Sequence, residues 1–162
     1  QRQMCIRDRL EHTLSVTKIC DFYAGNYPII HRDLLICAGM FHDIGKLEEI
    51  SRFPQNDYTD EGQLLGHIII GTEMISEHIR AIPDFPVQLA NELKHCILSH
   101  HGELEFGSPK KPALAEAVAL NLADNADAKM QTLTEIFKGK TGTDWLGFNR
   151  LFDSNLRRTS GA

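Results

Sequence analysis

The stretch that decides the fold of this chain is AGMFHDIGK, residues 38–46. A histidine and an aspartate stand side by side at the end of an apolar helical segment, and Gly45 can end that helix in the left-handed conformation. Adjacent residues on a helix point about 100° apart, so His42 and Asp43 can share a metal only at the helix end. The two oxygens of Asp43 can bridge two ions while His42 binds one of them. A chance pairing of a surface histidine with a capping aspartate is the alternative.

Length and composition limit the classes of protein to which this chain can belong. The chain has 162 residues, four cysteines, eight histidines and a formal net charge of −5. This length suits one domain that buries roughly two thirds of its unfolded surface. The cysteines are dispersed without a CxxC pair, and the sequence shows no run of about 18 apolar residues and no signal peptide. These features predict a soluble, cytoplasmic protein without a membrane partner. The negative charge argues against nonspecific binding of nucleic acid, although bound metal ions would neutralise part of it.

The spacing of apolar residues predicts an all-α bundle. The five expected core helices cover about residues 10–24, 32–43, 62–79, 87–101 and 113–131. Polar segments between them, 51–61 and 102–112, are expected to be loops.

The two ends of the chain are expected to differ from this bundle. Residues 1–9 have no apolar periodicity, and we expect a disordered tail or a non-native remnant there, with the domain spanning 10–162. Beyond a short helical turn at 132–138, a short C-terminal helix over 145–156 is expected to pack its apolar residues, which are Trp145, Phe148, Leu151 and Phe152.

Each of the five core helices carries a histidine or an aspartate on its inward row or at its inner end. These residues are His12, His42, Asp43, His67, His100, His101 and Asp124. A lone histidine on an apolar face is usually a core residue, but five helices that each bury such a group indicate a shared site. An aspartate in the apolar row of an alanine-rich helix is costly unless it is paired or binds a metal. Asp127 would assist Asp124, or else, because it lies off that row, it would simply face water.

The donor types predict the metals. A set rich in nitrogen with two carboxylates suits Mn²⁺, Fe²⁺, Co²⁺ or Zn²⁺ and disfavours Ca²⁺. Seven ligands are more than one ion takes, so we expect two divalent ions.

The order H, HD, H, HH and D resembles the HD-domain phosphohydrolase superfamily, in its two-metal form. More closely, ILSHHGELEFGSP (97–109), YTDEGQLLGHIIIG (58–71) and DNADAKM (124–130) are similar to the HD domain of YhaM-type 3′-to-5′ exoribonucleases. This resemblance implies a helical HD bundle, the seven residues above as ligands, Mn²⁺ as the favoured ion, and single-stranded RNA or DNA as substrate. Members of that family also carry an N-terminal OB-fold domain, so we expect this chain to be the catalytic part of a longer protein, with oligomerisation as a further expectation.

The expected chemistry uses two ions roughly 3.5–4 Å apart, which activate a water for attack on phosphorus. Asp43 would be the catalytic bridge. Lys46 would contact the phosphate, or else interact with the helix C-terminal dipole. His95 would protonate the leaving 3′-oxygen, or else be a partly exposed histidine. Lys110 and Lys111 would meet phosphates, unless they are simply solvated.

Three functions stay open at this point. The first is a metal-dependent 3′-to-5′ exonuclease. The second is a hydrolase of small nucleotides or cyclic dinucleotides, whose HD-GYP branch shares HDIGK, although no GYP string follows His100 and His101 here. The third is a noncatalytic regulatory domain that keeps the metals as a structural staple.

Overall fold

The computed structural model describes residues 6–52 and 54–160, with side chains from residue 8 onward. Within this part of the chain the structure is mainly helical, which confirms the all-α prediction. The helices are α1 (Ile6–Asn26), α2 (Arg32–Phe41), α3 (Lys46–Glu49), α4 (Asp60–Arg80), α5 (Val87–Ser99), the 3-10 turn η1 (Leu104–Phe106) and α6 (Ala115–Phe137). A small antiparallel pair, β1 (Phe148–Asn149) and β2 (Ser154–Asn155), follows.

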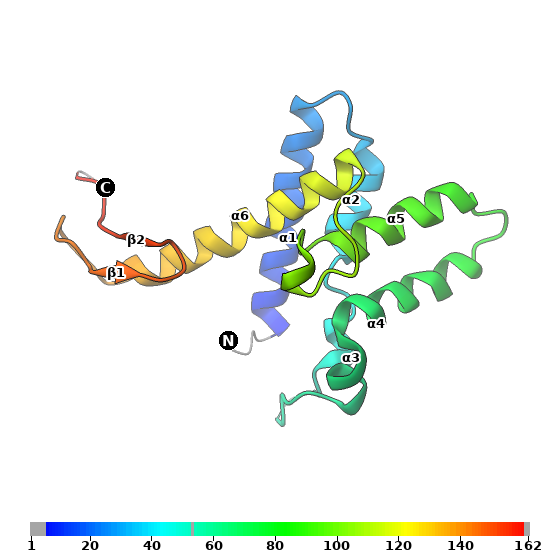
Figure 1. Ribbon diagram of the computed structural model, residues 1–162, viewed down its shortest axis with the longest axis horizontal. Coiled ribbons are helices and arrows are strands. Elements are labelled where there is room, and N and C mark those ends of the chain that lie inside the picture. The colour runs from blue at the N-terminus through cyan, green and yellow to red at the C-terminus, as the bar shows by residue number, and fades with distance from the viewer. Residues whose placement is uncertain (1–5, 53, 161–162) are drawn as a thin grey trace. The chain divides into compact units, whose positions relative to one another are not determined.

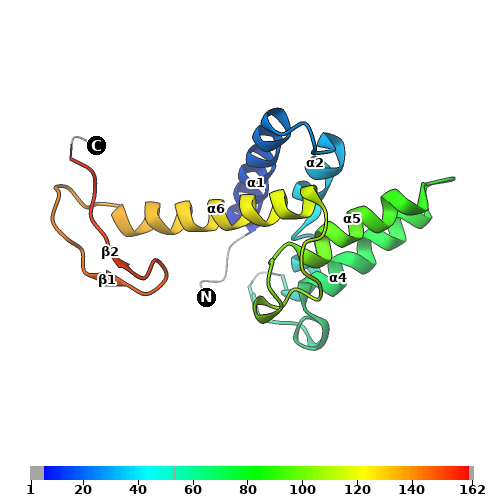
Figure 2. The same cartoon turned by 45° about the horizontal axis from the view of Figure 1, so that its top comes forward.

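The chain divides into two compact units, one up to Ala128 and the other from Lys129 onward. In the first unit α1 packs on α2, α2 on α5, and α4 on both α3 and α5 (Figure 1). The two views agree that α4 and α5 run side by side (Figure 2). The fully buried apolar residues at the centre of this unit are Val16, Cys20, Leu35, Ala38, Cys96, Ile97, Ala117, Leu120 and Ala123. Burial of a large side chain such as Leu35 contributes roughly 1.5–3 kcal/mol.

The turn after α2 docks closely against α4 because both partners are glycines. Gly45 has a right-handed φ of −62°, so the expected left-handed helix cap is wrong. A Cβ at Gly45 would lie 2.0 Å from His67 O and 2.6 Å from Gly71 N. Position 45 therefore requires glycine because a side chain would not fit, and not because of its backbone conformation. Since α2 ends at Phe41, His42 and Asp43 both project from this turn.

A second glycine breaks α4. Gly66 has a φ of +73°, and the helix is interrupted there. A Cβ at Gly66 would meet nothing within 4 Å, so this position needs glycine for its left-handed backbone rather than for a close approach. The break immediately precedes His67 and so affects the direction in which the His67 side chain projects from α4.

Three expectations at the ends are corrected. Helix α1 begins at Ile6, so residues 6–9 belong to it and not to the tail expected over 1–9, of which residues 1–5 lie outside the described part. Helix α6 continues to Phe137 and includes the turn expected separately. The C-terminal helix over 145–156 is wrong, because Gly147 and Asp153 have φ values of +95° and +47°, which no helix accommodates.

The apolar residues of that segment do not pack as expected either. Trp145, Phe148 and Leu151 are 62%, 66% and 58% exposed. Their helical spacing therefore does not reflect a buried face. The guanidinium of Arg157 lies 5.4 Å from the centre of the Trp145 ring instead.

We expect Gly45→Ala to lower the free energy of unfolding by about 3 kcal/mol, at the upper end of overpacking costs, because its methyl group would meet backbone atoms that cannot rotate away. Gly25→Ala is the matched control, since a Cβ at Gly25 meets nothing within 4 Å. It should leave stability unchanged or slightly increased. Urea unfolding followed by circular dichroism measures both, and equal stability of the two variants would contradict the close approach at Gly45.

Candidate metal centre

The predicted ligands converge in the first unit as two groups of potential metal donors. The first group is His12, His42 and Asp124, and the second group is His67, His100 and His101. Within each group the ligand atoms lie within 4.8 Å of one another. The structure thus brings together residues from α1, α4 and α6 and from the ends of α2 and α5.

Asp43 lies between the two groups, and each of its oxygens faces one of them. Its Oδ2 is 3.6 Å from His42 Nε2 and 4.0 Å from His12 Nε2. Its Oδ1 is 3.7 Å from His67 Nε2 and 3.8 Å from His100 Nε2. These separations are too long for hydrogen bonds. They leave room between the donors, and one carboxylate is shared by both groups.

Backbone carbonyls orient three of the five imidazoles. His42 and His100 each donate Nδ1–H to the carbonyl three residues earlier, at 2.8 and 2.7 Å. His101 donates to Phe106 O at 2.9 Å. A carbonyl can only accept, so Nδ1 carries the proton and the lone pair of Nε2 is free for a metal.

Carboxylates orient the other two imidazoles. Glu49 was missed from the sequence, and Asp127 was considered there only as an assistant to Asp124. His67 Nδ1 donates to Glu49 Oε1 at 3.1 Å. His12 Nδ1 donates to Asp127 Oδ2 at 2.6 Å, and the hydroxyl of Ser15 donates to the other oxygen of Asp127. Of the two alternatives for Asp127, the one in which it faces water is wrong, since it is 4% exposed. The available signal was the pair His12 and Ser15, which lie on one face of a helix and can share a partner.

Four buried polar atoms at the centre have no hydrogen-bond partner among the described residues. They are His42 Nε2, Asp43 Oδ1, His67 Nε2 and His100 Nε2. A buried polar group left unsatisfied costs about 1–3 kcal/mol, so four of them around one space require an explanation. Imidazole nitrogens and carboxylate oxygens together suit divalent transition metals. The residues present therefore fit divalent metal ions.

The charges at the centre agree with this fit. Burial alone would raise the pKa of Asp43, but the neighbouring His42, Lys46 and His100 hold it well below its usual range. Burial lowers the pKa of His67, and together with the nearby imidazoles it lowers that of His100 to about 3. At neutral pH the carboxylate of Asp43 is therefore charged, while His67 and His100 are neutral and able to bind a cation.

His12 behaves differently because two carboxylates face it. Burial acts to lower its pKa, but hydrogen bonds to Asp124 and Asp127 outweigh burial and raise it to about 9. Its Nε2 lies 3.0 Å from Asp124 Oδ1. A proton thus holds the position between these two side chains, and a metal that binds the first group has to displace it.

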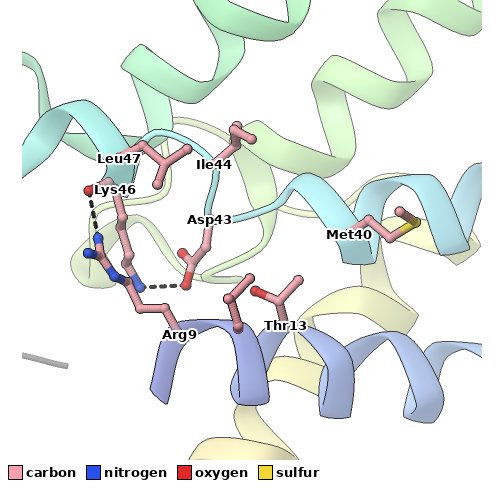
Figure 3. Close-up of a pocket in the computed structure, with 8 residues that line it drawn as sticks. Arg9, Thr13, Met40, Asp43, Ile44, Lys46 and Leu47 are labelled. Atoms are coloured by element: carbon pink, nitrogen blue, oxygen red, sulfur yellow. Dashed lines mark hydrogen bonds and ion pairs between the residues drawn. The ribbon is translucent and has the colours of Figure 1, made fainter. Parts of the chain in front are cut away.

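Lys46 is the cation already present beside the centre. Its Nζ donates to Asp43 Oδ2 at 2.6 Å, and Figure 3 shows the two side chains facing each other. A pocket of about 140 Å³ opens beside them. It is lined by Arg9, Leu10, Thr13, Met40, Asp43, Ile44, Lys46 and Leu47. The ammonium of Lys46 therefore contacts a ligand candidate directly, where it can also meet a group bound at Asp43.

The remaining predicted residues lie outside both ligand groups. His95 Nε2 accepts a hydrogen bond from the backbone N–H of Ala113 at 2.9 Å, and burial together with Lys110 lowers the pKa of His95. A ring nitrogen that accepts cannot donate a proton at the same time, so Nε2 is not free to protonate the leaving oxygen, and the role of His95 as the acid stays a prediction. Lys110 and Lys111 are exposed, and Lys111 pairs with Glu103 at 2.6 Å.

Comparison with known proteins agrees with the geometry. The model of the HD domain family matches residues 9–129. The "3'-5' exoribonuclease YhaM" of Bacillus velezensis is 43% identical over 121 residues, which are 74% of this chain and 38% of that protein. Its namesakes in Bacillus subtilis and Listeria innocua are 41% and 37% identical, over 75% and 78% of this chain and 38% and 40% of those proteins.

The chain therefore spans about two fifths of the length of the curated relatives it matches. No solved structure matches it. Among the described residues, no helix is both long enough and apolar enough to cross a membrane.

We expect Asp127→Asn to weaken Mn²⁺ binding by the first group about 10- to 100-fold, the usual loss when the partner of a ligating histidine is removed. The amide is nearly the same size but cannot carry the charge that supports His12. Isothermal titration calorimetry measures the affinity. Asp144→Asn is the control, since Asp144 is exposed in the second unit. Equal affinities in the two variants would show that Asp127 does not act on the metal.

Proposed function

Because the chain belongs to the HD domain family, we propose that it is a metal-dependent phosphodiesterase that removes nucleotides from the 3′ end of single-stranded RNA. The observation that carries the proposal is Asp43, whose two oxygens face two separate groups of metal donors. The names of the similar proteins support RNA as the substrate. DNA as a second substrate, an OB-fold domain in the full-length protein, oligomerisation and a cytoplasmic location stay predictions.

The first and second groups would each hold one divalent cation, with Asp43 shared between them. Manganese is the favoured ion, and iron, cobalt and zinc suit the same donors. Bound there, divalent ions stabilise charge on phosphoryl oxygens and lower the pKa of a water that attacks phosphorus.

The chain's own residues then position and neutralise the reacting groups. Asp43 keeps its charge at neutral pH, because its pKa is depressed, and so maintains the spacing of the two donor groups. The hydrogen bonds at the five Nδ1 atoms fix the orientation of the imidazoles, so little reorganisation accompanies substrate binding. Lys46 would exchange its contact with Asp43 for a phosphate oxygen of the substrate, and its ammonium would offset the negative charge there.

We expect the Mn²⁺-loaded protein to shorten a 5′-labelled single-stranded RNA from its 3′ end, and a chelator to stop the reaction. A gel of the labelled products measures this. The same protein is offered a panel of mononucleotides and cyclic dinucleotides in parallel. Turnover of the small substrates alone would replace the exonuclease with a small-substrate hydrolase. Inactivity toward both, with metal bound, would favour the noncatalytic regulatory domain.

We expect Asp43→Ala to abolish turnover while the protein stays folded, because it removes the carboxylate shared by the two groups. The measurements are the RNA assay and far-ultraviolet circular dichroism. His78→Ala is the control, since His78 is exposed and its Nδ1 bonds to its own helix, at Met74 O. It should keep full activity. An Asp43→Ala protein with more than about a few per cent of wild-type activity would contradict the two-metal mechanism.

A further inference from the structure

Glu49 is a buried carboxylate that belongs to neither ligand group, and the mechanism above uses no more of it than its bond to the His67 ring. It is the last residue of α3 and is 7% exposed. Its Oε1 accepts two hydrogen bonds, and both come from His67: the backbone N–H at 3.0 Å and the ring Nδ1–H at 3.1 Å. One oxygen thus holds the main chain and the side chain of the same metal-ligand candidate.

The backbone bond compensates for the break in α4. An N–H group that follows such a break lacks the usual helical acceptor, in the same way as the first N–H groups of any helix. Gly66 makes this break, and Glu49 supplies the missing acceptor to His67. The side chain of Glu49 therefore serves as the cap of the second half of α4, although it comes from another helix.

Contacts of its own backbone hold Glu49 in place. Its carbonyl accepts a hydrogen bond from the N–H of Thr59 at 3.0 Å. A Cβ at Gly62 would come within 2.3 Å of the same carbonyl oxygen, so only glycine allows this contact. The start of α4 therefore packs directly against the end of α3, and this contact fixes the position from which the Glu49 carboxylate reaches His67.

The ring bond determines how His67 presents its metal-binding atom. With Nδ1–H given to Glu49, the lone pair of Nε2 points to the centre, where that atom is buried, has no hydrogen-bond partner among the described residues and lies 3.7 Å from Asp43 Oδ1. A carboxylate behind an imidazole also makes it a stronger metal ligand. The other two imidazoles of the second group are held by backbone carbonyls, so Glu49 is the carboxylate that stands behind this group of three imidazoles.

We propose that Glu49 is the positioning residue of the second group: it caps the broken helix and orients His67 toward the cation that this group binds. The inference rests on the proposed function, because it assigns Glu49 a role at the same metal centre. The first group has its own carboxylates, Asp124 as a donor and Asp127 behind His12. Loss of Glu49 should therefore weaken one cation and spare the other.

The test is Glu49→Gln, which keeps an oxygen that can cap His67 N–H but removes the charge. Calorimetric titration with Mn²⁺ should show one ion bound with wild-type affinity and the second bound about 10- to 100-fold more weakly. The control is Glu48→Gln on the same short helix, where the side chain is exposed and both affinities should match the wild type. In the His67→Ala background, Glu49→Gln should have no further effect on Mn²⁺ binding, because Glu49 acts through His67.

A second readout needs no metal. Nitrogen-15 NMR of the metal-free wild type should show His67 with its proton on Nδ1, and Glu49→Gln should shift the ring toward a mixture of tautomers. Equal weakening of both ions, a further loss in the His67→Ala background, or an unchanged His67 tautomer would each overturn the positioning role. A wild-type protein that binds no Mn²⁺ would instead contradict the proposed function, and the tautomer measurement would still decide the role of Glu49.

Discussion

The first unit depends on a charged carboxylate kept away from water. Asp43 has a side chain only 9% exposed, yet its pKa lies below the usual range. Burial of a charge is expensive unless positive charge or hydrogen bonds surround it. Lys46 supplies one such contact at 2.6 Å, but Oδ1 has no hydrogen-bond partner in the described part of the chain. The imidazoles of His42, His67 and His100 present lone pairs rather than N–H groups to this centre, so a bound cation would satisfy the carboxylate and these histidines together.

Such a centre requires that backbones approach more closely than ordinary side chains permit. Gly45 and Gly71 allow the turn that carries His42 and Asp43 to touch α4 directly. Gly66 then breaks α4 just before His67, and the lost helical hydrogen bond is replaced by one to a side chain. The fold gives up regular helix geometry at the point where a ligand must turn toward the centre. Local irregularity of this kind is common where backbone is shaped for binding.

Orientation of the ligands is shared between two kinds of acceptor. His42, His100 and His101 use carbonyls of neighbouring residues, which come with the ends of α2 and α5 and the loop that follows. His12 and His67 use carboxylates from other helices. The first kind depends on local chain geometry alone. The second kind connects each group of donors to another helix. The hydrogen bonds from His12 to Asp127 and from His67 to Glu49 therefore also link helices of the unit.

The seven candidate ligands and the helices that carry them could be predicted from the sequence, because apolar spacing and helix ends are local properties. Other features depend on contacts that spacing does not reveal. Asp127 meets His12 across 115 residues and Glu49 meets His67 across 18, so neither carboxylate stands out in a single helical pattern. His95 is engaged by the backbone of Ala113, and the C-terminal residues form a hairpin despite helical spacing. Periodicity shows which side of an element is apolar, whereas only packing between elements decides which polar groups meet.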